Sequence, residues 1–139
     1  HKPLLEVRGD DYDQRVARRI KSGGLQSADE LIEVIAFREE MIDVYEQQLS
    51  GFDAFIMPTS PWAPPPIADL ADDDEYVRIN LNCLRNTFIG NFLDTCAIAQ
   101  PMGDQDGAPV GLMLMAAGGS DHSLFSVAEA VEGVIGFRA

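Results

Sequence analysis

Hydrophobic residues follow two patterns along this chain, short uninterrupted runs and a recurrence at every third or fourth position. The uninterrupted runs show no alternation of polar and apolar residues, and they cover residues 54–57, 96–99 and 110–115. A strand that is apolar on both faces is normally covered on both, because a face in contact with water would be polar. We therefore predict three strands that are buried on both faces, with helices above and below them.

The second pattern is typical of helices. It predicts helices over about residues 11–21, 28–49, 76–91 and 121–135. Ser27 and Glu30 have the spacing of a capping box, in which the hydroxyl and the carboxylate each accept a backbone N–H at the start of the second helix. Residues 1–9 carry no periodic signal.

Residues 58–75 are predicted to form a loop rich in proline and aspartate. Proline blocks helices and central-strand pairing, so the first part, 58–66, is expected to be stiff and extended. It leaves the carboxyl end of a predicted strand, where open α/β sheets bind their ligands. The acidic run 72–75 is expected to begin the next helix, because carboxylates favour a helix N-terminus. A calcium site is the alternative, but the spacing and the glycine of an EF-hand are missing. Residues 103–107 are predicted to form a turn.

The chain has 139 residues, the size of one domain, and we expect residues 1–139 to form a single region. Three buried strands are too few for a complete sheet, because sheets average about 5–6 strands and exposed apolar edges aggregate. The predicted fold class is α/β, with a partial mixed sheet of about three buried strands flanked by helices. We expect this to be a fragment of a larger sheet.

Charge and composition exclude several classes of partner. The formal net charge of −13 argues against nucleic acid and against an anionic membrane, because both are negatively charged themselves. No apolar run approaches the roughly 18 residues of a membrane span and no signal-type segment opens the chain, so a cytoplasmic location is expected. Cys83 and Cys96 are expected to be reduced, with a disulfide between them as the alternative, and two cysteines cannot form a metal cage. No metal or cofactor is expected.

The usual catalytic patterns are missing from this sequence. His1 lies at the terminus, and His122 lies in the first turn of a predicted helix, where the helix dipole disfavours a charged imidazole. No G-x-S-x-G nucleophile elbow is present. Gly118-Gly119 precedes a helix, but the lysine of a phosphate-binding loop is absent. We therefore assign no catalytic residue.

A series of short segments carries a family resemblance through its order and spacing. They are 51–59, 63–66, Arg85-Asn86-Thr87 with Asn91, 101–103, 107–112 and Asp121. Over about residues 10–132 they resemble the C-terminal third of the amidase signature family, the serine hydrolases that cleave carboxamides. Residues 93–96 are Leu-Asp-Thr-Cys, whereas the family usually has glycine-leucine-proline at this point. The resemblance therefore does not decide between two subfamilies, a free-standing amidase and one subunit of an amidotransferase.

The resemblance implies a mechanism that this chain does not carry by itself. The family uses a serine nucleophile, a second serine joined through a cis peptide, and a lysine base, in a part of the sequence that would lie upstream of His1. Lys2 and Lys21 are the chain's own lysines, and neither fits that pattern. The implied partners are a small-molecule amide substrate and the missing N-terminal part of the same fold.

The chain is expected to contribute a wall of the substrate pocket instead. The candidate substrate-binding residues lie on the loop after the first strand and on the helix before the second: Thr59, Ser60, Trp62, Arg85, Thr87 and Asn91. A purely structural interpretation pairs Arg85 with a local carboxylate, packs Trp62 on the prolines and lets Asn91 cap its helix. A different function is also open, a non-catalytic α/β module that forms a homodimer through an exposed sheet edge.

Overall fold

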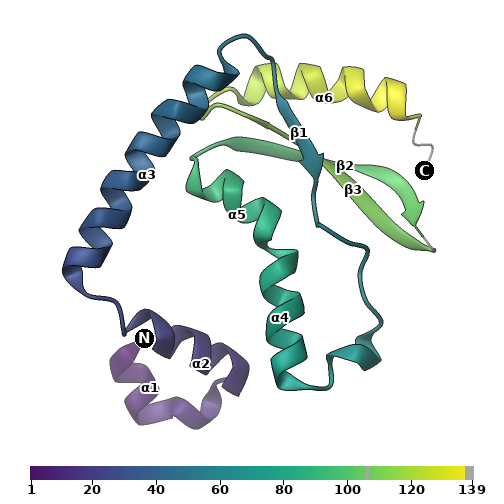
Figure 1. The fold of residues 1–139 in the computed structure, drawn as a ribbon. Helices are drawn as coiled ribbons and strands as arrows, with labels where there is room; N and C mark the ends of the chain where they lie inside the picture. Colours follow the sequence, from purple (N-terminus) through teal and green to yellow (C-terminus); the bar gives the residue numbers. More distant parts are fainter. Residues whose placement is uncertain (106, 137–139) are drawn as a thin grey trace. The chain divides into compact units, whose positions relative to one another are not determined.

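The computed structural model describes residues 1–105 and 107–136. The elements are α1 (Lys2–Arg8), η1 (Gly9–Asp11), α2 (Gln14–Gly23), α3 (Ala28–Leu49), β1 (Phe55–Pro58), η2 (Ile67–Leu70), α4 (Asp73–Cys83), α5 (Arg85–Phe92), β2 (Cys96–Gln105), β3 (Ala108–Ala116) and α6 (Asp121–Ile135) (Figure 1). The chain divides into two compact units, His1–Phe37 and Arg38–Ala139, and each is described by itself.

The first unit is helical. The helix predicted from about residue 11 begins later, as α2 at Gln14, because the Asp13 side chain accepts hydrogen bonds from the N–H groups of Arg15 and Val16 and so caps the helix there. A short helix, α1, precedes it where the sequence showed no periodicity, with a proline in its first turn.

Helix α3 begins with the predicted capping box, which the structure confirms. Ser27 Oγ accepts a hydrogen bond from the Glu30 N–H at 3.2 Å, and Glu30 Oε2 accepts one from the Ser27 N–H at 2.7 Å. The backbone hydrogen bond from Ser27 holds the pKa of Glu30 below its ordinary value, and the bond with the Ser27 side chain adds to the effect. The helix runs to Leu49, as predicted.

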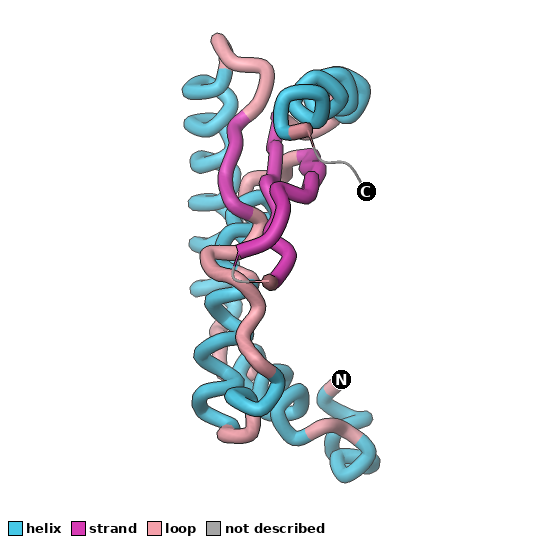
Figure 2. The backbone as a smooth tube through the Cα atoms, turned by 90° about the vertical axis from the view of Figure 1, so that its right-hand side faces the viewer, coloured by secondary structure: helices cyan, strands magenta, loops and turns pink. Residues whose placement is uncertain are grey.

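The second unit contains a three-stranded sheet in the order β1-β3-β2, with both pairings antiparallel. Phe55 pairs with Met115 across β1 and β3, and Cys96 pairs with Ala116 across β2 and β3. The strands, magenta in Figure 2, occupy the three predicted positions and confirm the α/β class. Strand β2 continues past its predicted end through Pro101, which an edge strand tolerates, and its register shifts between Pro101 and Gly103.

Helices cover the two faces of the sheet. Helix α6 lies on one face (Figure 1), and its Leu124 forms the buried apolar cluster with Leu114 and Ala116 of β3. On the other face α5 comes so close that a Cβ on Gly90 would lie 3.1 Å from Met115 Sδ. The central strand β3 is therefore covered on both sides, and its Leu114 and Met115 are fully buried.

The prediction that all three strands are buried on both faces is wrong for both edge strands within this chain, since Ala97 and Ala99 of β2 are exposed and so are two residues of β1. The side chains of Phe55 and Ile56 are 41% and 58% exposed. Strand β1 is an edge strand, so it has one neighbouring strand in this sheet, β3. An apolar edge strand of this kind normally has a partner.

The helix predicted over 76–91 is two helices, α4 and α5, separated at Leu84. Leu84 has φ −84° and ψ −9°, close to the bridge region, so the chain changes direction there although the apolar spacing continues. The acidic start is confirmed, because Asp72 caps α4 by accepting a hydrogen bond from the Glu75 N–H at 2.9 Å. The turn predicted over 103–107 is shorter in the structure, because β2 stays paired with β3 to Gln105. Position 106 lies outside the described residues, and Gly107 beyond it has φ +79°.

Two further predictions can be compared with the structure. Cys83 and Cys96 are free thiols, as expected. Within residues 1–105 and 107–136, no helix combines the length and the apolar character that crossing a membrane requires.

Candidate functional site

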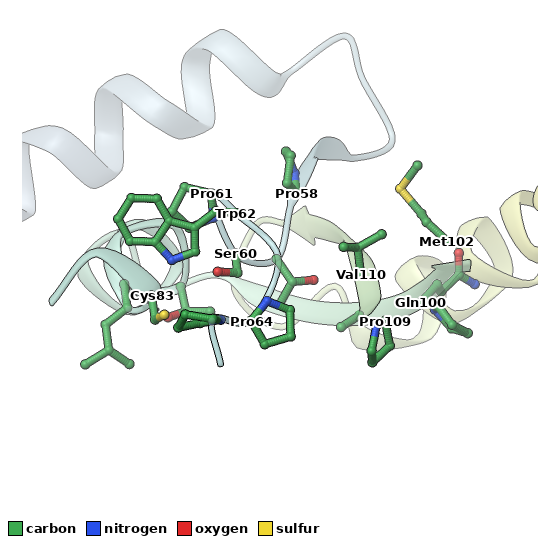
Figure 3. A pocket seen from close by; sticks show the side chains of 17 residues that line it. Pro58, Ser60, Pro61, Trp62, Pro64, Cys83, Gln100, Met102, Pro109 and Val110 are labelled. Carbon is green, nitrogen blue, oxygen red and sulfur yellow. Dashed lines mark hydrogen bonds between the residues drawn. The ribbon is translucent and has the colours of Figure 1, made fainter. Parts of the chain in front are cut away.

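A cavity of about 750 Å³ lies where three segments of the second unit meet. They are the proline-rich loop after β1, the junction of α4 and α5, and the hairpin formed by β2 and β3. The lining residues are Pro58, Thr59, Ser60, Pro61, Trp62, Pro64, Pro65, Cys83, Leu84, Thr87, Ala99, Gln100, Pro101, Met102, Pro109, Val110 and Gly111. Figure 3 shows Trp62 and Met102 toward opposite ends, with Ser60 and Val110 between them.

Two hydrogen bonds hold the proline-rich loop in place. The Thr59 N–H donates to the Gly111 carbonyl at 2.8 Å, which continues the pairing of β1 with β3 by one residue. The Asn86 side chain donates from Nδ2 to the Pro58 carbonyl at 2.7 Å, and Asn86 is only 5% exposed. Because the loop's prolines have no N–H to donate, these two bonds fix the start of the loop against β3 and α5.

Gly111 allows the loop to approach the hairpin closely. A Cβ at position 111 would lie 2.8 Å from Thr59 Oγ1 and 3.4 Å from Thr59 Cβ, which is closer than such atoms normally pack. A side chain at this position would therefore push the loop away from β3 and change the wall of the cavity.

The polar atoms of the lining residues are mostly buried or engaged in hydrogen bonds. Thr59 Oγ1 and Ser60 Oγ are buried, and neither has a hydrogen-bond partner in the described part of the chain. Thr87 Oγ1 donates to the Leu84 carbonyl at 3.1 Å, and Gln100 Nε2 donates to the carbonyl of Ala128 in α6. The lining is consequently apolar in character, although it contains several polar residue types.

Trp62 lies beside a charged pair on α4. The Arg78 guanidinium carbon is 5.7 Å from the centroid of the Trp62 ring, within the range of a cation–π contact. Glu75 accepts two hydrogen bonds from Arg78, from Nε at 2.7 Å and from Nη2 at 2.6 Å. These bonds hold the pKa of Glu75 below its ordinary value and raise that of Arg78, so both groups stay charged over a wide pH range.

The structure brings four of the six predicted site residues together. Thr59, Ser60, Trp62 and Thr87 line the cavity. Arg85 and Asn91 are exposed and are not among the lining residues. Arg85 Nε donates to Asn86 Oδ1 at 3.4 Å, and the C-cap of α5 is Leu93 rather than Asn91.

Sequence reasoning missed Asn86 and Gly111, which shape the site, and Arg78, which contacts its tryptophan. No local pattern marked Asn86, because its partner, the Pro58 carbonyl, lies 28 residues away in the sequence. Nothing in the sequence indicated the contact of Gly111 with Thr59, because it depends on how the loop crosses the hairpin.

The cavity does not offer a nucleophile with a base. None of its lining residues is a lysine, a histidine or a carboxylate, and His122 lies on the exposed first turn of α6. Within the described residues, no group of three or more histidine, cysteine, aspartate and glutamate side chains could hold a metal ion. The arrangement can bind a small molecule, but it provides no catalytic pair.

Comparison with known proteins identifies the family. A family model described as Amidase matches residues 2–125, most of the chain. This chain belongs to the amidase family. The match confirms the resemblance to amidase sequences, which was carried by segments of the proline-rich loop, α5 and the hairpin of β2 and β3.

The amidase relatives fall into two groups by name. The chain is 36% identical over 85 residues to 2-amino-5-chloromuconic acid deaminase of Comamonas testosteroni, a match that covers 60% of this chain and 18% of that protein. It is 30% identical over 134 residues to a glutamyl-tRNA(Gln) amidotransferase subunit of Sulfurisphaera tokodaii, covering 92% of this chain and 28% of that protein. The chain thus spans less than a third of the length of these relatives.

A solved amidase structure shares the fold. The match has a TM-score of 0.78 and 20% sequence identity, and it covers 96% of this chain and 31% of the other. The chain accordingly has the fold of one part of an amidase.

Proposed function

We propose that this chain is the C-terminal segment of an amidase that hydrolyses carboxamide C–N bonds. The observation that carries the proposal is the family match over residues 2–125, together with a cavity that the same residues line. A serine hydroxyl attacks the amide carbonyl, the C–N bond breaks, and ammonia or an amine leaves with a proton. Water then hydrolyses the acyl-serine ester and releases the carboxylic acid.

The proposed catalytic serines and lysine belong to the part of the fold that this chain does not cover. Support comes from the cavity lining, which has hydroxyl groups at Thr59 and Ser60 but no base beside them. A hydroxyl without a base is a weak nucleophile at neutral pH. The chain would therefore supply a pocket wall to the missing N-terminal part, its proposed partner, and would be inactive by itself.

The substrate-binding role is proposed for the residues that line the cavity, Thr59, Ser60, Trp62 and Thr87. Arg85 and Asn91 would contact substrate only if it extended beyond this cavity. The proposed location is the cytoplasm, in line with the free thiols of Cys83 and Cys96.

A serine-reactive sulfonyl fluoride tests the position of the nucleophile. The full-length protein is incubated with the reagent and digested, and the modified serine is located by mass spectrometry. The expected label lies on a serine outside residues 1–139, and its appearance tracks the loss of carboxamide hydrolysis. A label on Ser60 that accompanies inactivation would contradict the proposal.

The edge strand β1 favours a second candidate, self-association of a non-catalytic module. Its Phe55 and Ile56 are exposed and its outer edge is available for pairing. Analytical ultracentrifugation of the 139-residue chain separates the candidates. A stable dimer that an Ile56→Lys substitution disrupts would favour the module, whereas a monomer or an aggregating species is expected for an amidase segment.

A further inference from the structure

The charge and surface chemistry of the cavity indicate which part of a substrate it accepts. We infer that this cavity binds an uncharged, apolar substituent of the carboxamide, such as an aromatic or branched aliphatic group, and excludes a substituent that carries a carboxylate. The inference rests on the proposed amidase function and adds the class of substrate.

The first observation is the absence of charge in the wall. None of the 17 lining residues has an ionisable carboxylate, ammonium, guanidinium or imidazole group. A carboxylate that packed against this wall would leave water without meeting a cation from it, and such burial is strongly unfavourable. The formal net charge of −13 on the chain repels anions at longer range as well.

The second observation is that the wall's hydroxyl and amide groups are hidden or engaged. The hydroxyl oxygens of Thr59 and Ser60 are buried beneath the surface, and that of Thr87 donates to a backbone carbonyl. Gln100 donates from its amide nitrogen to the Ala128 carbonyl of α6, and its Oε1 is buried without a hydrogen-bond partner in the described part of the chain. A ligand would therefore meet mainly the carbon atoms of prolines, Trp62, Leu84 and Val110.

The third observation concerns the cation beside the cavity. Arg78 lies over the Trp62 ring, and its Nε and Nη2 donate two short hydrogen bonds to Glu75, so its charge is already paired. A substrate carboxylate that approached Arg78 would also approach the negative charge of Glu75, which opposes it. Arg78 therefore holds the tryptophan wall and is not a receptor for an anionic substrate.

The volume is consistent with a group of moderate size. About 750 Å³ falls within the range of cavities that accept a complete small organic ligand. The six prolines of the lining make it stiff, so a flat or branched apolar group can fill it without reordering the wall.

Paired substrates test the inference in the full-length protein. Hydrolysis of para-methylbenzamide and of para-carboxybenzamide is compared as kcat/KM, and the neutral substrate should be favoured by about 100-fold or more. Val110→Lys places an ammonium group on the wall and should reduce that preference about tenfold, whereas Ile67→Ala, outside the cavity, should leave it unchanged. Equal rates, or a preference for the carboxylate, would overturn the inference.

Cys83 provides a binding test that needs no turnover. It lines the cavity, and trypsin releases it in the peptide 79–85, whereas Cys96 lies in a different peptide. N-ethylmaleimide labelling of Cys83 should be slowed by para-methylacetophenone and not by para-acetylbenzoate, with Cys96 labelling unaffected by either. Equal protection by both ketones, no protection by either, or a Cys83 that the reagent never modifies would overturn the inference.

The two experiments separate failure of the inference from failure of the proposed function. If no carboxamide is hydrolysed, the amidase proposal fails, and the Cys83 result still decides whether the cavity prefers neutral ligands. If carboxamides are hydrolysed but the carboxylate-bearing one is preferred, the amidase proposal stands and the substrate class is wrong.

Discussion

The side chain of Asn86 connects two segments that the sequence places far apart. Its amide donates to the carbonyl of Pro58 from a position that is almost fully buried, and the next residue along the loop, Thr59, bonds to Gly111 of the hairpin. A buried carbonyl without a donor is costly, so a single amide has a large influence on where the loop lies.

We predict that Asn86→Ala lowers the free energy of unfolding by about 1–3 kcal/mol, because the Pro58 carbonyl loses its donor. Denaturant unfolding measures the change. Asn91→Ala is the matched control, since Asn91 is exposed on the same helix and its substitution should change stability by less than about 0.5 kcal/mol. Equal effects of the two substitutions would show that the bond to Pro58 contributes nothing.

The hydroxyl of Tyr45 gives a prediction that depends on pH. It is buried without a hydrogen-bond partner in the described part of the chain. Burial raises the pKa of Tyr45 above its usual 10.0, and Cys96 adds to the effect. The folded state therefore keeps the Tyr45 proton at a pH where the unfolded state begins to lose it. The stability that the protonated Tyr45 contributes is complete below pH 10 and is lost as pH rises through the folded-state pKa.

Tyr45→Phe should remove that loss of stability above pH 10 and should stabilise the chain at neutral pH by about 1 kcal/mol, since no buried hydroxyl remains unpaired. Thermal unfolding followed at neutral and alkaline pH checks both parts. Tyr12→Phe is a suitable comparison for general alkaline effects. An identical pH dependence before and after the Tyr45 substitution would refute the assignment.

Local chemistry explains which site residues could be predicted. Thr59, Ser60 and Trp62 follow directly from a strand that ends at a proline, so the sequence alone placed them at the cavity. Thr87 also lines the cavity, whereas Arg85, two residues earlier on the same helix, does not. Contacts such as that of Arg78 with Trp62 join separate elements, and no local pattern encodes them.

The elements themselves were largely predictable where a strong local signal existed. The Ser27 capping box, the acidic start of α4 and the three apolar strands all appear in the structure. The extension of β2 through Pro101 was not predicted. Proline is excluded from central strands but allowed in edge strands, and the sequence does not show which of the two β2 is.

Helix α3 depends on its capping box for a defined start. Ser27→Ala removes the hydroxyl that accepts the Glu30 N–H, and we predict a loss of about 0.5–2 kcal/mol with fraying of the first turn. Amide hydrogen exchange of residues 28–31 should accelerate. Ser27→Asp, which keeps an N-cap acceptor, should retain most of the protection; if Ser27→Ala exchanges no faster than the parent, the cap is unimportant.

At the scale of the whole molecule, apolar surface remains exposed on the sheet and on a helix of the second unit. Phe55 and Ile56 of β1 and Phe125 of α6 are exposed within this chain. The matched amidase structure continues well beyond the 31% that this chain covers. The account proposed here is that the uncovered part of the amidase fold covers these side chains and brings the catalytic serines and lysine to the cavity.

Ammonia release tests this account most directly. The 139-residue chain and the full-length protein are incubated at equal concentration with the same neutral aromatic carboxamide, and ammonia is followed over time against a heat-denatured control. The account predicts steady release by the full-length protein and none above the control by the chain alone. Ammonia release by the purified 139-residue chain would contradict it.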